Sequence, residues 1–235
     1  MENILVVHKL NKAIGKDKIL RNVSFSVPKG KICAFIGPNG AGKTTTIKSI
    51  MGLFRYNSGE ITVNGLNTKK IASHKFIGYV PEKENFPKVK ARSFIRMMAS
   101  LSGMKRRDIK TEIKYYERVF DIKNRLHINL NSMSSGQKKK VMIIQSLIHD
   151  PELIIMDEPT ENLDPDTRDT FYKLMNKLKK CGKSIFISTH NLDEIQNYAD
   201  YIVVLIHGQV KIEFNHQRGV DLHRVYNKYK DKVRI

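Results

Sequence analysis

Residues 31–46 read KICAFIGPNGAGKTTT, and this stretch decides the fold. After Lys31, the apolar residues 32–36 are typical of a buried strand, and a helical pattern follows from about residue 43 to residue 51. The glycine-rich loop between them, Gly37 to Thr44, matches the pattern GxxxxGK[ST]. Such a loop can be an ordinary turn before a helix. Here it lies between a strand and a helix, which is the context in which its amides bind phosphate.

The loop predicts a site for a nucleoside triphosphate and a magnesium ion. Gly40 and Gly42 let backbone N–H groups converge on phosphate oxygens, and the helix N-terminus adds positive potential. The Lys43 ammonium is expected to reach the β- and γ-phosphates, and the Thr44 hydroxyl can bind Mg²⁺. The predicted phosphate-binding residues are Gly37, Pro38, Asn39, Gly40, Ala41, Gly42, Lys43, Thr44 and Thr45.

Two acidic residues follow a second apolar run. Asp157 and Glu158 come directly after residues 153–156, so they lie at the carboxyl end of a predicted strand, where open α/β sheets bind their ligands. The pair could be a solvated acidic turn, but a phosphate loop upstream requires a carboxylate for its metal ion. We therefore predict that Asp157 holds Mg²⁺ and that Glu158 polarises a water molecule.

The composition is that of an ordinary globular chain with an excess of positive charge. Of the 235 residues, 40% are hydrophobic and 28% charged, which argues against a disordered or coiled-coil protein. The net charge is +19, and residues 83–125 alone carry 13 basic and 5 acidic side chains. Charge of this kind permits contact with a polyanion without establishing it, and we predict no nucleic-acid partner.

Cysteine spacing and hydropathy exclude other classes of protein. Cys33 and Cys181 are far apart, without the spacing of a zinc site or a disulfide framework, which fits a reducing compartment. No run approaches the ~18 apolar residues of a membrane helix. Any membrane role is therefore expected to come through a partner.

The order of the apolar runs predicts an α/β fold. Runs at 4–7 and 19–27 suggest an antiparallel opening, and the runs at 76–80, 153–156, 184–188 and 201–205 are separated by helical stretches, as in a parallel sheet. From about residue 91 to residue 120 the pattern is helical. We interpret this segment as an inserted helical subdomain.

Three further motifs carry a family resemblance over almost the whole chain. Residues 133–137, Met-Ser-Ser-Gly-Gln, resemble the LSGGQ signature of ATP-binding cassette (ABC) transporter nucleotide-binding domains, although alone they would be a plain helix cap. Residues 162–164 resemble the D-loop of that family, and residues 188–190 resemble its switch histidine. The resemblance implies a RecA-like P-loop NTPase core with an N-terminal antiparallel β-subdomain, made of residues 1–87 and 147–235. It also implies a helical subdomain at 88–146.

The resemblance also implies an ATPase that works as a pair of subunits. Two copies would enclose two ATP molecules, with Ser134, Gly136 and Gln137 binding the ATP held by the other copy and Asp164 lying near it. Within one copy, Glu158 would act as the base on water, His190 would steady the γ-phosphate, and Lys43 would hold the phosphates. The implied metal ligands are Thr44, Glu82 and Asp157.

Three positions depart from the family pattern. Glu82 follows the strand at 76–80 where the family usually has Gln; with Phe86 and Pro87, it resembles the branch that exports peptides and antibiotics or confers immunity to them. Ile14 aligns with the aromatic residue that normally stacks on adenine; an aliphatic side chain there can cover the base face but forfeits π stacking, unless another aromatic residue supplies the stack. Ser135 replaces the first signature glycine, and its small size is expected to preserve amide donation.

The resemblance implies a role in transport, with two alternatives from other classes. The chain would be the ATP-hydrolysing subunit of an exporter, bound to a transmembrane permease at the cytoplasmic face of the cell membrane. A soluble assembly ATPase, of the kind that serves iron-sulfur cluster building, would use the same cycle without a permease. A nucleic-acid-linked ABC protein is the other alternative, although the long coiled coil and the second cassette of its known types are not found here.

Overall fold

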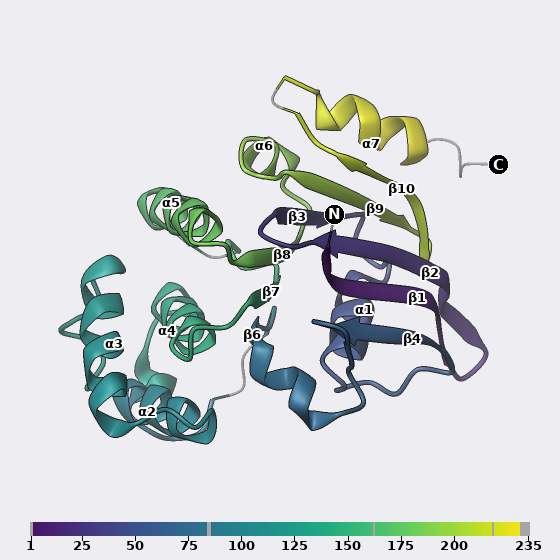
Figure 1. The fold of residues 1–235 in the computed structure, drawn as a ribbon. Coiled ribbons are helices and arrows are strands. Elements are labelled where there is room, and N and C mark those ends of the chain that lie inside the picture. Colours follow the sequence, from purple (N-terminus) through teal and green to yellow (C-terminus); the bar gives the residue numbers. More distant parts are fainter. Residues whose placement is uncertain (1, 84–85, 162, 218, 231–235) are drawn as a thin grey trace.

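The computed structural model describes residues 2–83, 86–161, 163–217 and 219–230. Figure 1 shows two sheets with helices around them, and a group of helices beyond one edge of the larger sheet. In chain order the elements are β1 (Asn3–Ile14), β2 (Asp17–Pro28), β3 (Ile32–Ile36), α1 (Lys43–Ile50), β4 (Ser58–Val63), β5 (Leu66–Asn67), a 3₁₀ turn (Ile71–Phe76), β6 (Ile77–Val80), α2 (Ala91–Leu101), α3 (Arg106–Val119), a second 3₁₀ turn (Leu130–Ser132), α4 (Ser135–Leu147), β7 (Leu153–Asp157), α5 (Pro165–Lys180), β8 (Ser184–Thr189), α6 (Leu192–Ile195), β9 (Tyr201–Ile206), β10 (Gln209–Asn215) and α7 (Leu222–Lys230).

The larger sheet has six strands in the order β10-β9-β3-β8-β7-β6, all parallel except for the β9–β10 pair. Every residue of β3, β7 and β8 is buried, because helices pack on one face of the sheet and the smaller sheet with α1 packs on the other, which favours continuous apolar strands. In the register, Ile36 pairs with Thr189, and Asp157 pairs with Ser188. The carboxyl ends of three neighbouring strands therefore place the glycine loop, the acidic pair and His190 at one edge.

The smaller sheet is antiparallel, in the order β2-β1-β4-β5, as the first apolar runs predict. Strand β1 continues to Ile14, well beyond the predicted end at Val7, because its polar residues pair with β2 in a long hairpin. Aromatic rings join the two sheets. Phe25 of β2 stacks on Phe35 and Phe186 of the larger sheet, with ring centroids 5.2 and 5.4 Å apart.

Helices α2, α3 and α4 lie together beyond β6 (Figure 1). The predicted helical segment 91–120 is in fact two helices, because the chain turns at Gly103, whose φ of +84° lies in the left-handed region that favours glycine. Helix α4 runs back along β6. A Cβ added to Gly78 of β6 would lie 2.0 Å from the carbonyl oxygen of Ser146, so that only glycine permits this close approach. The division of the chain at residues 88 and 146 stays a prediction.

Cys33 is buried and Cys181 exposed, and both are free thiols. Within the described ranges, no helix combines the length and the apolar character needed to span a bilayer.

Candidate active site

The glycine loop leaves β3 and enters α1 at the N-terminus of that helix. A Cβ on Gly37 would lie 2.2 Å from the Leu205 carbonyl oxygen, so the first loop position must be glycine. Gly42, with a φ of +103°, caps α1, and no described side chain bonds to the amides at this helix end. These unpaired N–H groups and the helix dipole favour a phosphate at this position.

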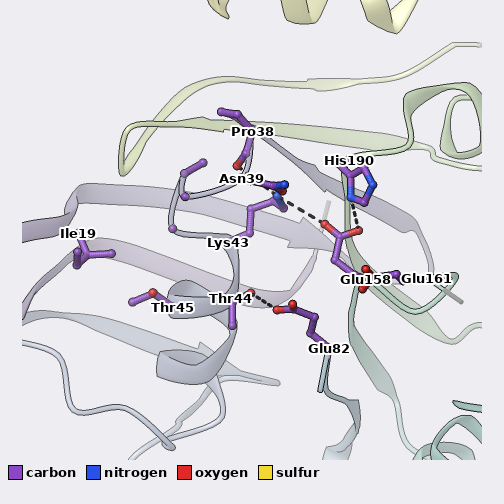
Figure 2. A pocket seen from close by; sticks show the side chains of 13 residues that line it. Ile19, Pro38, Asn39, Lys43, Thr44, Thr45, Glu82, Glu158, Glu161 and His190 are labelled. Carbon is purple, nitrogen blue, oxygen red and sulfur yellow. Dashed lines mark hydrogen bonds and ion pairs between the residues drawn. The ribbon is translucent and has the colours of Figure 1, made fainter. Parts of the chain in front are cut away.

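A cavity of about 460 Å³ opens over the loop (Figure 2). A cavity of this volume can hold a nucleotide-sized ligand. Its wall combines the loop and α1 with side chains from the ends of β6, β7 and β8. The lining residues are Ile19, Pro38, Asn39, Gly40, Ala41, Gly42, Lys43, Thr44, Thr45, Glu82, Glu158, Glu161 and His190.

Lys43 extends across the mouth of the loop. Its ammonium group donates a hydrogen bond to the Gly37 carbonyl at 2.9 Å, and it lies 3.6 Å from a carboxylate oxygen of Glu158. The side chain is 7% exposed, so this positive charge is almost fully removed from water and is paired within the site. The geometry places the ammonium between the phosphate loop and the acidic pair, where a γ-phosphate would lie.

Asp157 is fully buried at the end of β7 and has one unsatisfied oxygen. The Ser188 hydroxyl donates to Oδ1, whereas Oδ2 makes no hydrogen bond to the described residues. Burial raises the pKa of Asp157, and the neighbouring carboxylates of Glu82 and Glu158 raise it further. A cation beside Oδ2 would offset both effects, because it stabilises the charged carboxylate.

The oxygen atoms around Asp157 fit Mg²⁺. The Thr44 hydroxyl donates to Oε2 of Glu82 at 3.3 Å, so the P-loop helix and the end of β6 meet beside the buried carboxylate. Mg²⁺ binds through one or two protein carboxylates together with phosphate and water oxygens, and does not need an all-protein cage. In keeping with this, the described residues contain no cluster of three or more His, Cys, Asp or Glu side chains suited to a metal ion.

Glu158 projects into the cavity from a strained backbone. Its φ is +46°, and its N–H donates to both the carbonyl and the hydroxyl of Ser188, which fixes this conformation. Nδ1 of His190 lies 3.0 Å from Oε2 of the Glu158 carboxylate (Figure 2). The carboxylate is therefore held between Lys43 and His190 within the cavity.

The signature residues do not line this cavity. Ser134 caps α4 and forms a reciprocal capping box with Gln137: the Ser134 side chain accepts from the Gln137 N–H at 3.3 Å, and the Gln137 side chain accepts from the Ser134 N–H at 3.2 Å. The predicted helix cap is therefore present. Ser134, Gly136 and Gln137 are not among the residues that line the Lys43 cavity.

Asp164 is likewise outside the cavity. It caps α5, accepting from the Thr167 N–H at 2.9 Å, and its hydrogen bonds with Thr167 lower the pKa of Asp164. Of the other predicted D-loop residues, Asn162 lies outside the described residues.

Sequence reasoning missed three residues of the site. Ile19 and Glu161 line the cavity, whereas Ile14, assigned to adenine by the resemblance, is 55% exposed at the hairpin tip and is not a lining residue. Apart from its place just after the Asp157-Glu158 pair, nothing in the local sequence marks Glu161, and nothing marks Ile19. The third is Ser188, which orients both acidic residues; its position directly before Thr189 and His190 was the available signal.

The parallel sheet carries a phosphate loop after β3, and β7, the next strand but one in the sheet, ends in a buried carboxylate with a second carboxylate beside it. This arrangement defines an ATPase of the P-loop class. Comparison with known proteins gives the family. Residues 20–161, more than half of the chain, match the family described as ABC transporter. The chain belongs to this family, which confirms the predicted family, fold class and ATP-binding role.

Individual relatives agree with this assignment. A Mycoplasma pneumoniae protein provisionally named as an ABC transporter ATP-binding protein is 40% identical over 88% of this chain, and the match spans 65% of that longer protein. The lantibiotic transport ATP-binding protein SrtF of Streptococcus pyogenes is 31% identical over 95% of this chain and 96% of its own length. A solved structure of an ATP-binding subunit of an ABC transporter superposes with a TM-score of 0.91 at 31% identity, covering 97% of this chain and 99% of that one.

Proposed function

We propose that this chain hydrolyses Mg-ATP in the Lys43 cavity and thereby drives transport through a separate membrane subunit. The single observation that carries the proposal is the Glu158 carboxylate, held by Lys43 and His190 beside the unsatisfied oxygen of Asp157. This arrangement combines a base, a phosphate-binding cation and metal ligands within one cavity.

Each side chain has a defined part in the proposed reaction. The loop amides and Lys43 bind and orient the phosphates, and Thr44, Glu82 and Asp157 would hold Mg²⁺. The metal ion, when bound, neutralises charge that develops on the phosphate oxygens. Glu158 accepts a proton from the attacking water at its carboxylate, and His190 fixes the orientation of that carboxylate through Nδ1.

A second copy of the chain is part of the proposal. Ser134, Gly136 and Gln137 cap a helix away from the cavity, so they can contact only a nucleotide that is bound elsewhere. In the proposed dimer, each α4 N-terminus points its amides at the ATP of the other copy, because a helix N-terminus favours an anion.

The transported substrate is proposed from the relatives and from Glu82. The S. pyogenes relative of nearly equal length is named for lantibiotic transport. Glu82 and the following Phe86 and Pro87 resemble the same branch of the family. We therefore infer export of a peptide or antibiotic, with this subunit bound to its permease at the cytoplasmic face of the membrane.

The Glu158→Gln variant tests the proposed chemistry. We expect ATP turnover to fall by at least about a hundredfold while Mg-ATP affinity changes little, because the loop contacts remain and only the base is lost. With ATP, this variant is expected to sediment as a dimer and without ATP mainly as a monomer, since ligand that binds only the closed state stabilises it. Turnover at the wild-type rate would contradict the assignment of Glu158.

A further inference from the structure

Lys139 lies on α4 where this helix passes the carboxyl end of β6. Its side chain is 3% exposed, and its ammonium group donates hydrogen bonds to two consecutive carbonyls, that of Pro81 at 3.2 Å and that of Glu82 at 3.1 Å. A buried ammonium is costly unless it is well paired. The lysine therefore holds residues 81–82 firmly against α4.

Glu82 connects this contact to the nucleotide site. Through its carboxylate it accepts the hydrogen bond of Thr44, the predicted metal ligand on α1, and through its carbonyl it accepts the hydrogen bond of Lys139. Lys139 itself lies on the same helix as Ser134, five residues from this cap. A chain of two hydrogen bonds thus runs from the phosphate loop to the signature end of α4.

The C-terminal end of α4 is held against the start of β6 by other contacts, which do not involve residues 81–82. Gly78 lets the strand backbone approach the carbonyl of Ser146 closely. At the far end of the helix, Nε2 of His149 lies 3.1 Å from the Ile77 carbonyl oxygen. Of these contacts between α4 and β6, that of Lys139 lies nearest to the Lys43 cavity, because it is made to Glu82. Lys139 itself does not line the cavity.

We propose that Lys139 is a positioning residue that makes the N-terminus of α4 move with Glu82 when Mg-ATP binds at Thr44. The inference rests on the proposed function, because Ser134 and Gly136 at this helix end would bind the ATP of the second copy. Without the two hydrogen bonds of Lys139, Glu82 can still respond to the nucleotide, but α4 no longer follows it. Lys139 thus affects the assembly of the two copies and not the ATP affinity of one.

The test compares variants of Lys139 in the Glu158→Gln protein. Lys139→Met removes the donors at nearly constant length, and Lys139→Gln restores an N–H donor without the charge. Lys138→Met makes the same chemical change at the neighbouring, half-buried lysine. Hydrogen exchange is measured for residues 78–83 and 134–138, with and without Mg-ATP, at a concentration where sedimentation shows monomers. ATP affinity is measured with a fluorescent ATP analogue, and dimer formation by sedimentation at higher concentration.

In the Glu158→Gln protein and with Lys138→Met, we expect Mg-ATP to slow exchange in both segments. With Lys139→Met, only residues 78–83 are expected to respond, ATP affinity stays within about twofold, and dimerisation weakens about tenfold, a typical coupling between sites. Lys139→Gln is expected to recover part of the response at 134–138, and it carries the test if Lys139→Met does not fold.

Equal responses of both segments with Lys139→Met, or an equal loss with Lys138→Met, would overturn the inference alone. A Glu158→Gln protein that binds no Mg-ATP would overturn the proposed function, and the inference with it. The ATP titration distinguishes these two failures.

Discussion

The Asp157 carboxylate is proposed to bind Mg²⁺, but its burial lowers the stability of the folded protein at neutral pH. The carboxylate is fully buried with one oxygen unsatisfied, and burial together with Glu82 and Glu158 raises its pKa. The folded protein therefore holds this proton more tightly than the unfolded chain does. The contribution of Asp157 to the free energy of unfolding is lost as the pH rises through its raised pKa.

We expect Asp157→Asn to increase the free energy of unfolding at pH 7, in the absence of nucleotide, by about 1 kcal/mol, as for other relieved active-site residues. The gain should shrink as the pH falls toward the ordinary pKa of a carboxyl group, because the wild-type residue then becomes neutral. Urea unfolding at a series of pH values measures it, with exposed Asp17→Asn as the control. The same variant should lose the Mg²⁺ dependence of ATP binding. A gain that does not vary with pH would contradict the assigned cause.

The two isoleucines near the hairpin of β1 and β2 provide a matched pair. Ile19 lines the cavity, whereas Ile14 is exposed at the hairpin tip. We expect Ile19→Ala to weaken ATP binding about fivefold, or about 1 kcal/mol, through lost apolar contact, and Ile14→Ala to change it by less than about twofold. Fluorescence titration with ATP decides between them. A larger loss for Ile14→Ala would support its predicted place over the adenine.

At the scale of secondary-structure elements, close backbone approach fixes the position of α4. Helix α4 has buried residues along most of its length, and it contacts β6 where Gly78 meets the Ser146 carbonyl. Ser134 caps α4 and Lys139 lies within it. The packing of this helix against β6 therefore determines where both residues lie.

Gly78→Ala tests this contact. An added Cβ would lie 2.0 Å from the Ser146 oxygen, so the helix must shift, and we expect the free energy of unfolding to fall by about 3 kcal/mol. Gly103→Ala is the control, since its Cβ would have no described atom within 4 Å and only the left-handed backbone costs about 1 kcal/mol. Urea unfolding compares the two variants. Equal losses would show that α4 does not depend on close packing against β6.

At the scale of the whole molecule, the net charge of +19 opposes the assembly of two identical copies. Basic side chains are concentrated in residues 83–125, a range that includes α2 and α3. Two bodies with the same large charge repel each other over about 10 Å at moderate salt. ATP-driven dimerisation and binding to a nucleic acid must therefore respond to salt in opposite directions.

We expect ATP-driven dimerisation of the Glu158→Gln protein to strengthen a few-fold when salt rises from about 50 to about 300 mM, because screening weakens the repulsion between copies. Sedimentation at fixed Mg-ATP measures this change. Binding to DNA or RNA would weaken steeply over the same range, because counterions are released on binding. Tight, salt-sensitive nucleic-acid binding, with dimerisation unaffected, would favour the nucleic-acid-linked alternative.

The sequence by itself determined the parts of this protein that depend on local patterns. The strand, glycine loop and helix at residues 31–51, the acidic pair after β7 and the helix cap at Ser134 are all adjacent in the chain, so their residue types indicate their structure directly. The order of these parts also predicted the fold class, because parallel strands bring their carboxyl ends to one edge.

The tertiary structure alone decided which distant side chains meet. Ser188 and Asp157 are 31 residues apart, Thr44 and Glu82 are 38 apart, and Lys139 and Pro81 are 58 apart. Ile19 instead of Ile14 lines the cavity because the path of the β1–β2 hairpin, with its bulges, decides which side chain reaches the loop. Such contacts depend on strand register and helix packing over long separations, and neither leaves a periodic signal in the local sequence.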